Sequence, residues 1–260
     1  MKFNAYIIYT FLILSLISFC SNNLVKNLIH SRGCNKDSGV MSHNEKKIIL
    51  MTHNSLRNQI ALGTNSIGPR LPYAQNMIQM YYNDAIGAKA QAWANKCTFK
   101  HSPMNERKQP MFKTGENIYQ TTWYNGRPEK NWQRIIEFWF SEIKDFAGKS
   151  VVTYSNQGKN TGHFTQLIWA YSYFVGCGYA SFSSAPRTVT HLHVCQYGPV
   201  GNIIGFPIYK ASPDTKRCAC PAELACNNLT FPGLCCPPGH CNHNAIEFTG
   251  EPFPGTIPNV

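Results

Sequence analysis

Acidic residues are scarce in this chain. The 260 residues contain 13 Asp and Glu against 24 Lys and Arg, a net charge of +11, and only 14% are charged while 43% are hydrophobic. This balance excludes a disordered chain and indicates a globular protein with a weakly charged surface. Residues 21–210 hold 21 Lys and Arg and 9 Asp and Glu. Acidic proteins, glycosaminoglycans or anionic membranes would suit that charge, but the cations are spread along the sequence, which favours a role in solubility.

Long apolar runs are also missing, apart from one at the start. Ala5–Phe19 follows Lys2 and precedes Cys20 and Ser21, the order of a secretory signal peptide, which we place at residues 1–21. The run is shorter than the ~20 residues of a membrane-spanning helix, so we expect no transmembrane segment. The sequence thus predicts a secreted, extracellular protein and excludes nucleic acid as a partner.

The cysteine count supports export. The chain has 11 cysteines, and removing Cys20 with the signal peptide leaves an even number, which an oxidising compartment would pair into five disulfides. The ten are Cys34, Cys97, Cys177, Cys195, Cys218, Cys220, Cys226, Cys235, Cys236 and Cys241. Six of them fall within residues 218–241. This segment is too short for a hydrophobic core of its own and needs disulfides to hold it.

The pattern of apolar residues predicts both helices and strands, without an internal repeat. Helices are expected at 44–62 (Asn44 as N-cap, Gly63 as C-cap), from 83 or 84 to 97, at 131–146, and, shorter, at 162–172. Strands are expected at 115–122, 174–182 and 189–197. Cys177 and Cys195 lie in the last two strands, where facing cysteines of a hairpin could form a bridge. We divide the chain into an N-terminal arm (22–43), a main domain (44–210), a cysteine-rich mini-domain (214–241) and a flexible tail (242–260).

One stretch places an imidazole beside an apolar surface. In GHFTQLIWAYS (162–172), His163 directly precedes Phe164, and Leu167, Ile168 and Trp169 follow. A half-buried histidine responds to its neighbours, so His163 is a candidate site residue if other polar groups converge on it. The alternative is a structural histidine satisfied by one hydrogen bond. His53, His191 and His193 are expected to be packing or surface residues.

Four blocks of sequence resemble the CAP superfamily, which includes cysteine-rich secretory proteins, venom antigen 5 and pathogenesis-related proteins. GHFTQLIWAYS is similar to its first signature, and HLHVCQYGPVGNI (191–203) to its second, with a departure at His193. GENI (115–118) and WFSEIKDF (139–146) match two further blocks in family order. The resemblance covers about residues 44–210 and implies an α+β protein with a three-layer α-β-α sandwich, here with a small disulfide-rich C-terminal extension.

The resemblance also implies a central cleft lined by two histidines and two acidic residues. By motif these are His101, Glu116, Glu142 and His163, with His101 resting on the shortest block, KHS. Glu137 points away from the apolar side of its helix and is the poorer candidate. Two histidines could hold a divalent metal such as Zn²⁺ while the carboxylates orient the rings, although no cofactor is required. The alternatives are a structural hydrogen-bonded cluster and a catalytic site.

Catalysis has little support in the sequence. A hydrolase needs an activated nucleophile beside a base, but the chain has no G-x-S-x-G motif, and every cysteine outside the signal peptide has an expected partner. Ser102 follows His101, yet sequence neighbours seldom point at each other. A metal-bound water activated by the histidines is the remaining route to hydrolysis.

The resemblance further implies two disulfides, Cys177–Cys195 and Cys34–Cys97. The other six cysteines would then pair among themselves in one of 15 ways. Their region departs from the family, because antigen 5 proteins end near the position of Tyr209 and vertebrate cysteine-rich secretory proteins carry ten cysteines there. Channel block, associated with that longer domain, therefore does not transfer directly. Asn228 lies in a glycosylation sequon within this region.

We expect from these observations a secreted effector of the venom or saliva type that binds a receptor, an ion channel or another extracellular protein. A lipid or sterol carrier is the first alternative, and a metal-dependent hydrolase the second.

Overall fold

A computed structural model describes residues 34–35, 41–125, 130–155, 160–212, 218–227 and 230–241. The expected signal peptide, most of the N-terminal arm, the tail and Asn228 lie outside these residues. The proposed domain boundaries stay predictions.

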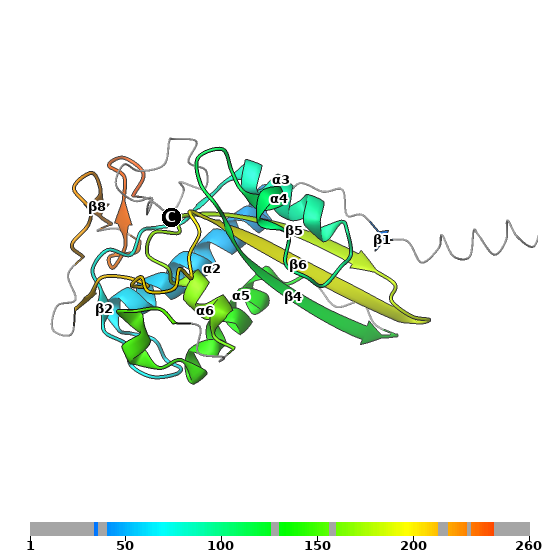
Figure 1. The fold of residues 1–260 in the computed structure, drawn as a ribbon, viewed down its shortest axis with the longest axis horizontal. Coiled ribbons are helices and arrows are strands. Elements are labelled where there is room, and N and C mark those ends of the chain that lie inside the picture. Colours follow the sequence, from blue (N-terminus) through cyan, green and yellow to red (C-terminus); the bar gives the residue numbers. More distant parts are fainter. Residues whose placement is uncertain are drawn as a thin grey trace, which may run out of the picture.

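A mainly antiparallel sheet forms the middle layer, with strand order β1-β5-β6-β4 along its main path (Figure 1). Its long strands are β4 (Gly115–Tyr124), β5 (Phe174–Phe182) and β6 (Thr188–Gly198), and the short β1 (Cys34–Asn35) pairs with β5 at the edge. The short β3 (Tyr81–Tyr82) pairs in parallel with β5. Apolar, β-branched and aromatic residues dominate these strands, as expected for a sheet covered on both faces.

Helices cover both faces of the sheet. On one face, α3 (Asp84–Ala94) crosses β5 and β6 and is followed by the short α4 (Met104–Arg107). Gly176 and Gly178 let α3 approach closely, because a Cβ atom at either position would overlap the helix backbone. On the other side lie α2, α5 and α6 (Figure 1), with bounds His43–Leu62, Trp132–Phe140 and Gly162–Leu167. The three-layer α-β-α arrangement predicted for this α+β chain is therefore confirmed.

Several element boundaries differ from the sequence prediction. Helix α2 begins one residue earlier than expected, because Ser42 rather than Asn44 is its N-cap and forms a capping box with Glu45. Gly63 ends it in the left-handed region as predicted (φ 61°). Helix α3 ends at Ala94 rather than Cys97, with Asn83 capping its start. The expected helix 131–146 is α-helical only to Phe140 and continues as the 3-10 helix η1 (Ser141–Asp145).

The cysteine-rich extension packs against the main body. It contains β8 (Ala225–Cys226) paired with β9 (Cys235–Cys236). In the body, the short strands β2 (Tyr73–Ala74) and β7 (Ala211–Ser212) pair with each other, and the 3-10 helix η2 spans Gly148–Val151. Phe231 and Leu234 belong to the main hydrophobic core. The Cys235 amide donates to the Met77 carbonyl at 2.7 Å, and Cys235 accepts from Gln79 at 2.8 Å. The extension thus shares the core of the body rather than forming one of its own.

Nine of the ten expected cysteines are disulfide-bonded among the described side chains. Cys177 and Cys195 face each other across β5 and β6 with their Cα atoms 4.1 Å apart. In the extension the pairs are Cys218–Cys226, Cys220–Cys235 and Cys236–Cys241, one of the 15 pairings left open. Cys97 is also bonded, and its pairing with Cys34 stays a prediction.

Candidate functional site

All four residues of the proposed cleft line one cavity of about 820 Å³. Glu116 comes from β4, Glu142 from η1, His163 from α6, and His101 from the loop before α4. The sequence motifs are far apart along the chain, and the sheet and its covering helices bring them together. Glu137, the rejected alternative, is exposed on α5 and accepts a hydrogen bond from Gln133 instead.

Glu142 holds His163 through both the ring and the backbone. Its carboxylate lies 2.6 Å from His163 Nδ1 and accepts from the amides of His163 (3.0 Å) and Phe164 (3.1 Å). These amides lie at the start of α6, where a negative charge is favourable because the first N–H groups of a helix have no partner within it. Trp139 stacks on the His163 ring with centroids 5.9 Å apart. The imidazole is therefore fixed in position, with one third of its side chain exposed.

Glu116 holds His101 from a buried position. His101 Nδ1 lies 3.0 Å from the carboxylate, which also accepts from Ser102 N (2.8 Å), Ser102 Oγ (2.5 Å) and Gln196 Nε2 (3.0 Å). Burial raises the pKa of Glu116, but the hydrogen bonds from His101, Ser102 and Gln196 outweigh it, so the pKa is lowered overall. The Glu116 side chain is 1% exposed and the His101 side chain 57%, so His101 is the open edge of the cleft.

A buried hydrogen-bond chain supports the cleft from behind. Asn117 Nδ2 donates to the His163 carbonyl at 3.0 Å and to the Tyr197 hydroxyl at 3.4 Å. The Tyr197 hydroxyl lies 3.0 Å from His53 Nε2, and His53 Nδ1 contacts the Ile49 carbonyl at 2.7 Å. His53 is thus a packing residue, one of the two roles expected for it. Sequence reasoning missed Asn117 and Gln196, although each belongs to a quoted motif (GENI and HLHVCQYGPVGNI).

His191 and His193 are also buried in the sheet. His191 Nδ1 lies 2.5 Å from the Tyr179 hydroxyl, and the His193 ring packs edge-on against Trp132 with centroids 5.0 Å apart. Neither residue lines the cleft. Their surroundings are those of packing residues, one of the two roles expected for them.

The cleft has the donor atoms for a metal but few of them. In both His–Glu pairs the carboxylate engages Nδ1, which leaves Nε2 without a hydrogen-bond partner among the described residues. A carboxylate on one ring nitrogen and a metal on the other is the usual arrangement of metal-binding histidines. No group of three close ligand atoms that includes these histidines is found within the described ranges. His101 and His163 each offer one ring nitrogen as a metal ligand.

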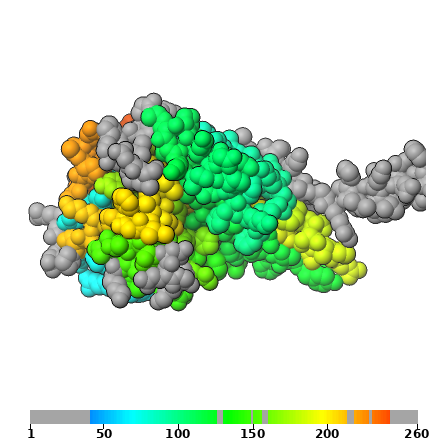
Figure 2. All heavy atoms as spheres, viewed as in Figure 1, coloured from blue at the N-terminus to red at the C-terminus, as the bar shows by residue number. Residues whose placement is uncertain are grey.

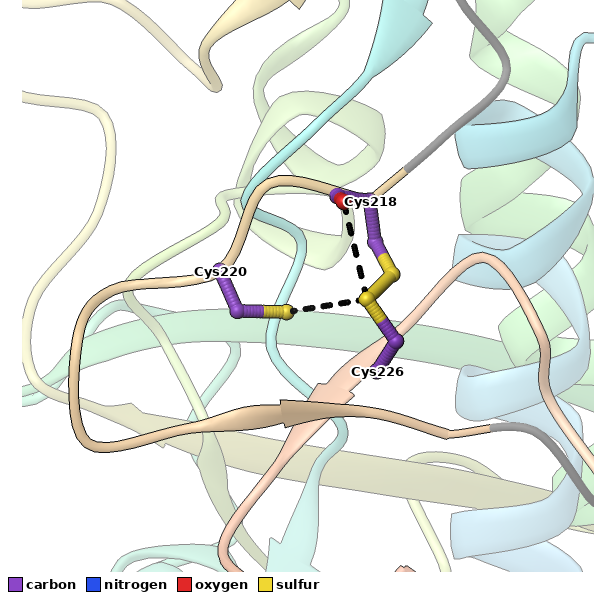
Figure 3. Close-up of side chains that lie close together, drawn as sticks. All are labelled: Cys218, Cys220 and Cys226. Carbon is purple, nitrogen blue, oxygen red and sulfur yellow. Dashed lines mark hydrogen bonds between the residues drawn. A yellow bond between two sulfur atoms is a disulfide. The ribbon is translucent and has the colours of Figure 1, made fainter.

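A second group of ligand atoms does not fit a metal. Cys218, Cys220 and Cys226 lie close together, with Cys220 Sγ 3.9 Å from Cys226 Sγ (Figure 3). Cys218 is bonded to Cys226, and Cys220 to Cys235. Metal binding by cysteine requires thiolates, and the sulfur atoms of disulfides are not thiolates.

Within the described part of the chain, Ser102 is not paired with a base as nucleophilic catalysis requires. Ser102 Oγ donates to the Glu116 carboxylate, and Arg107 donates to the Ser102 carbonyl. The hydroxyl therefore faces an acceptor that also binds His101, instead of an imidazole that could remove its proton. Among the described residues, the cleft is built to hold two imidazoles rather than to activate a serine.

Comparisons with known proteins agree with the fold. The family model of the cysteine-rich secretory protein family, CAP, matches residues 50–197. Venom allergen 5 of Tityus serrulatus is 34% identical over 210 residues, 78% of this chain and 50% of that protein. Scoloptoxin SSD976 of Scolopendra dehaani is 34% identical over 204 residues, 78% of this chain and 89% of that protein. The chain spans about half the length of several of the curated relatives it matches.

Solved structures give the same result. Na-ASP-1 has a TM-score of 0.60 at 29% identity, covering 75% of this chain and 47% of that one. NaASP2 with Zn²⁺ has a TM-score of 0.58 at 29% identity, covering 78% of this chain and all of the other. The sequence match and the fold agree, and the chain belongs to the cysteine-rich secretory protein family of the CAP superfamily, related to venom allergens and toxins.

Proposed function

We propose that this protein is a secreted effector of the venom or saliva type that binds an extracellular protein, a receptor or an ion channel. The kinship with venom allergen 5 and a scoloptoxin carries this proposal. The cleft supports binding over turnover, because its carboxylates are occupied by histidines and by Ser102 instead of activating a nucleophile. Among the described residues, no helix is both long and apolar enough to span a membrane.

The extension is the part we propose for target recognition. Its disulfides hold exposed residues on a short scaffold, among them Ala222, Glu223, Ala225 and His240. Its other side is fixed to the body: Asn227 Nδ2 donates to Gln79 Oε1 at 2.7 Å, and Gly233 N to Asn58 Oδ1 at 2.8 Å. A rigidly docked loop loses little entropy on binding, which favours affinity.

The test is binding of fluorescent full-length protein to intact cells before and after trypsin removes their surface proteins. We expect a saturable component that trypsin abolishes. The double variant Glu223→Lys/Ala225→Arg should weaken that component at least tenfold at unchanged Tm, because a charge reversal and a bulky charge would oppose docking. Arg134→Glu, an exposed change on α5, is the control. Saturable binding that survives trypsin in full would contradict a protein target.

We also propose that the cleft formed by His101, Glu116, Glu142 and His163 binds a divalent cation, with the two histidines as its protein ligands. Neutral imidazole nitrogens suit Zn²⁺, and the Glu116 and Glu142 carboxylates would fix the ring orientation. Titration calorimetry with ZnCl₂ should show one site that is lost in His101→Ala/His163→Ala and kept in His240→Ala, a histidine exposed in the extension. Equal Zn²⁺ binding by the double variant would refute this assignment.

A lipid carrier is a second candidate function, favoured by another cavity. A space of about 440 Å³ lies along α3 and is lined by Met41, Tyr82, Ala88 and Ala92 among others. That volume lies within the range of small-molecule pockets. Solvent extraction and mass spectrometry of the purified protein should then release lipid, and Ala88→Trp should reduce uptake by filling the space. A protein that is empty and takes up no lipid would count against this function.

A further inference from the structure

A second surface, away from the extension, combines exposed apolar and basic side chains. Around α4, Phe99 is 52% exposed, Met104 36% and Met111 56%. Lys100, Lys108 and Lys113 are exposed in the same short segment. We call these six residues the basic–apolar face. Large apolar side chains that are exposed together on a soluble protein commonly mark an interaction site.

The segment that carries the basic–apolar face is held against helix α3. Trp93 Nε1 donates to the Lys100 carbonyl at 2.8 Å, and Lys89 Nζ to the Lys108 carbonyl at 2.5 Å, so the segment around α4 lies against α3. Residues of this segment form a continuous teal-to-green part of the surface in Figure 2. The segment that carries these lysines is therefore fixed on the α3 side of the molecule.

The charge of the face is not neutralised from within. Between residues 89 and 113 the only acidic residue is Glu106, and its carboxylate pairs with Lys96 at 2.5 Å. Arg107 turns inward to the Thr114 and Ser102 carbonyls and lies 3.8 Å from Glu116. Lys100, Lys108 and Lys113 have no carboxylate partner among the described residues, so their charges face solvent.

We propose that the basic–apolar face docks the protein on an anionic phospholipid surface. Lipid satisfies both halves of the face, because Phe and Met side chains enter the headgroup boundary while lysine ammonium groups contact the anionic headgroups. An acidic polysaccharide would engage the lysines but leave Phe99, Met104 and Met111 in water. The binding is peripheral and reversible, and it is additional to the protein target proposed above.

This orientation has a consequence for the cleft. His101 lies in the loop between Lys100 and α4, and its side chain is 57% exposed. Docking through the neighbouring side chains Phe99, Lys100 and Met104 would therefore bring the open edge of the cleft close to the membrane surface.

The test is co-sedimentation of the full-length protein with phosphatidylcholine vesicles that contain or lack phosphatidylserine. We expect binding only with phosphatidylserine, and loss of that binding at high salt because the lysine charges are screened. Lys100→Gln/Lys108→Gln/Lys113→Gln should weaken binding roughly 100-fold, since each lysine near an anionic surface contributes about fivefold.

A matched pair of variants distinguishes binding through this face from non-specific adsorption to the vesicles. Phe99→Ala/Lys100→Gln should weaken binding about tenfold or more. Lys47→Gln/Ile48→Ala removes a similar exposed pair from α2, where Ile48 is 37% exposed, and should have no effect. All four sites are exposed, so circular dichroism and Tm should be unchanged.

Three outcomes would overturn the proposal. The first is no binding to phosphatidylserine vesicles, or binding that the triple variant keeps. The second is retention on immobilised heparin without vesicle binding, which would assign the face to an acidic polysaccharide. The third is a triple variant that loses only trypsin-sensitive binding to cells, which would assign the face to a protein. The vesicles contain no protein, so a failure here leaves the extension's proposed target untouched.

Discussion

At the scale of single residues, Glu116 is the cleft residue whose substitution we expect to affect stability most. It is buried, yet the donors around it hold its pKa down, so it is charged at neutral pH. We predict that Glu116→Gln lowers the free energy of unfolding by about 1–3 kcal/mol. The amide NH₂ would face donors where a carboxylate oxygen had accepted from Ser102 or His101.

Urea denaturation at pH 7 measures this effect. The control is Glu137→Gln on the exposed side of α5, which should stay within about 0.5 kcal/mol of the unmodified protein. A Glu116→Gln variant as stable as the control would show that the carboxylate charge is not needed to hold His101 and Ser102.

Two buried histidines predict a loss of stability in mild acid. Burial lowers the pKa of His53 to about 4, helped by the nearby Arg57 charge although the Ile49 carbonyl opposes it. Burial, with the charges of His191 and Lys130, lowers the pKa of His193 to about 3. Between pH 6.5 and pH 4, His53 and His193 therefore bind protons in the unfolded chain but stay neutral in the folded protein, so the free energy of unfolding falls as the pH falls.

Each of these histidines contributes a slope of up to about 1.4 kcal/mol per pH unit in that window. Unfolding in urea at several pH values between 7 and 4 gives the slope directly. His53→Gln should reduce this slope by the contribution of one histidine, whatever the variant's stability at pH 7. An unchanged slope would mean that His53 becomes protonated in the folded state.

At the scale of elements, the segment after α5 shows where the sequence was insufficient. Residues 131–146 have helical spacing, but the α-helix ends at Phe140, where Ser141 Oγ donates back to the Phe138 carbonyl at 2.7 Å. The tighter η1 turn places Glu142 at the start of α6. That contact joins residues 21 positions apart and is not encoded in the local pattern, so periodicity alone could not locate the end of the helix.

Helix α2 and the segment after α6 are joined by a buried arginine. Arg57 is fully buried and donates to the carbonyls of Ile78, Leu167, Trp169 and Ala170. Burial lowers the pKa of Arg57 to about 9, so it stays charged at neutral pH. We predict that Arg57→Lys costs about 3–5 kcal/mol, because an ammonium group cannot reach four carbonyls with the guanidinium's planar geometry.

Thermal and urea unfolding measure this loss. Arg134→Lys, an exposed position on α5, is the control and should leave stability within about 0.5 kcal/mol. If Arg57→Lys were equally mild, the guanidinium geometry would have no special role in fixing the segment that follows His163.

At the scale of the whole molecule, the body and the extension are expected to unfold together. Leu234 of the extension is fully buried in the main core, and Phe231 beside it is 5% exposed. We predict a single unfolding transition, with Leu234→Ala lowering the stability of the entire protein by about 2–5 kcal/mol. Leu224, partly buried at the edge of a smaller cluster, provides the control, and Leu224→Ala should cost clearly less.

Calorimetry distinguishes joint unfolding from independent unfolding of the body and the extension. If the two unfolded independently, two transitions would appear, and Leu234→Ala would shift only one of them.

The sequence predicted the layers of the molecule well and the packing of its extension poorly. Strand 174–182 has its predicted bounds, and the four residues proposed for the cleft from their motifs line one cavity. The expected disulfides are present in the extension, but the sequence pattern did not indicate that Phe231 and Leu234 also insert into the distant main core. Such long-range contacts depend on tertiary packing, which short-range patterns do not report.

The docking of the extension limits how it can be exchanged among relatives. Besides burying Leu234, it binds the body through Asn58, Gln75 and Gln79: Gly233 N donates to Asn58 Oδ1, Ala219 N to the Gln75 carbonyl, and Asn227 Nδ2 to Gln79 Oε1. In a chimaera that receives only this cysteine-rich segment, Leu234 would lack the core residues of the body against which it packs. Grafting it, or inheriting it by recombination, requires the matching positions of α2 and of the 75–79 loop to travel with it.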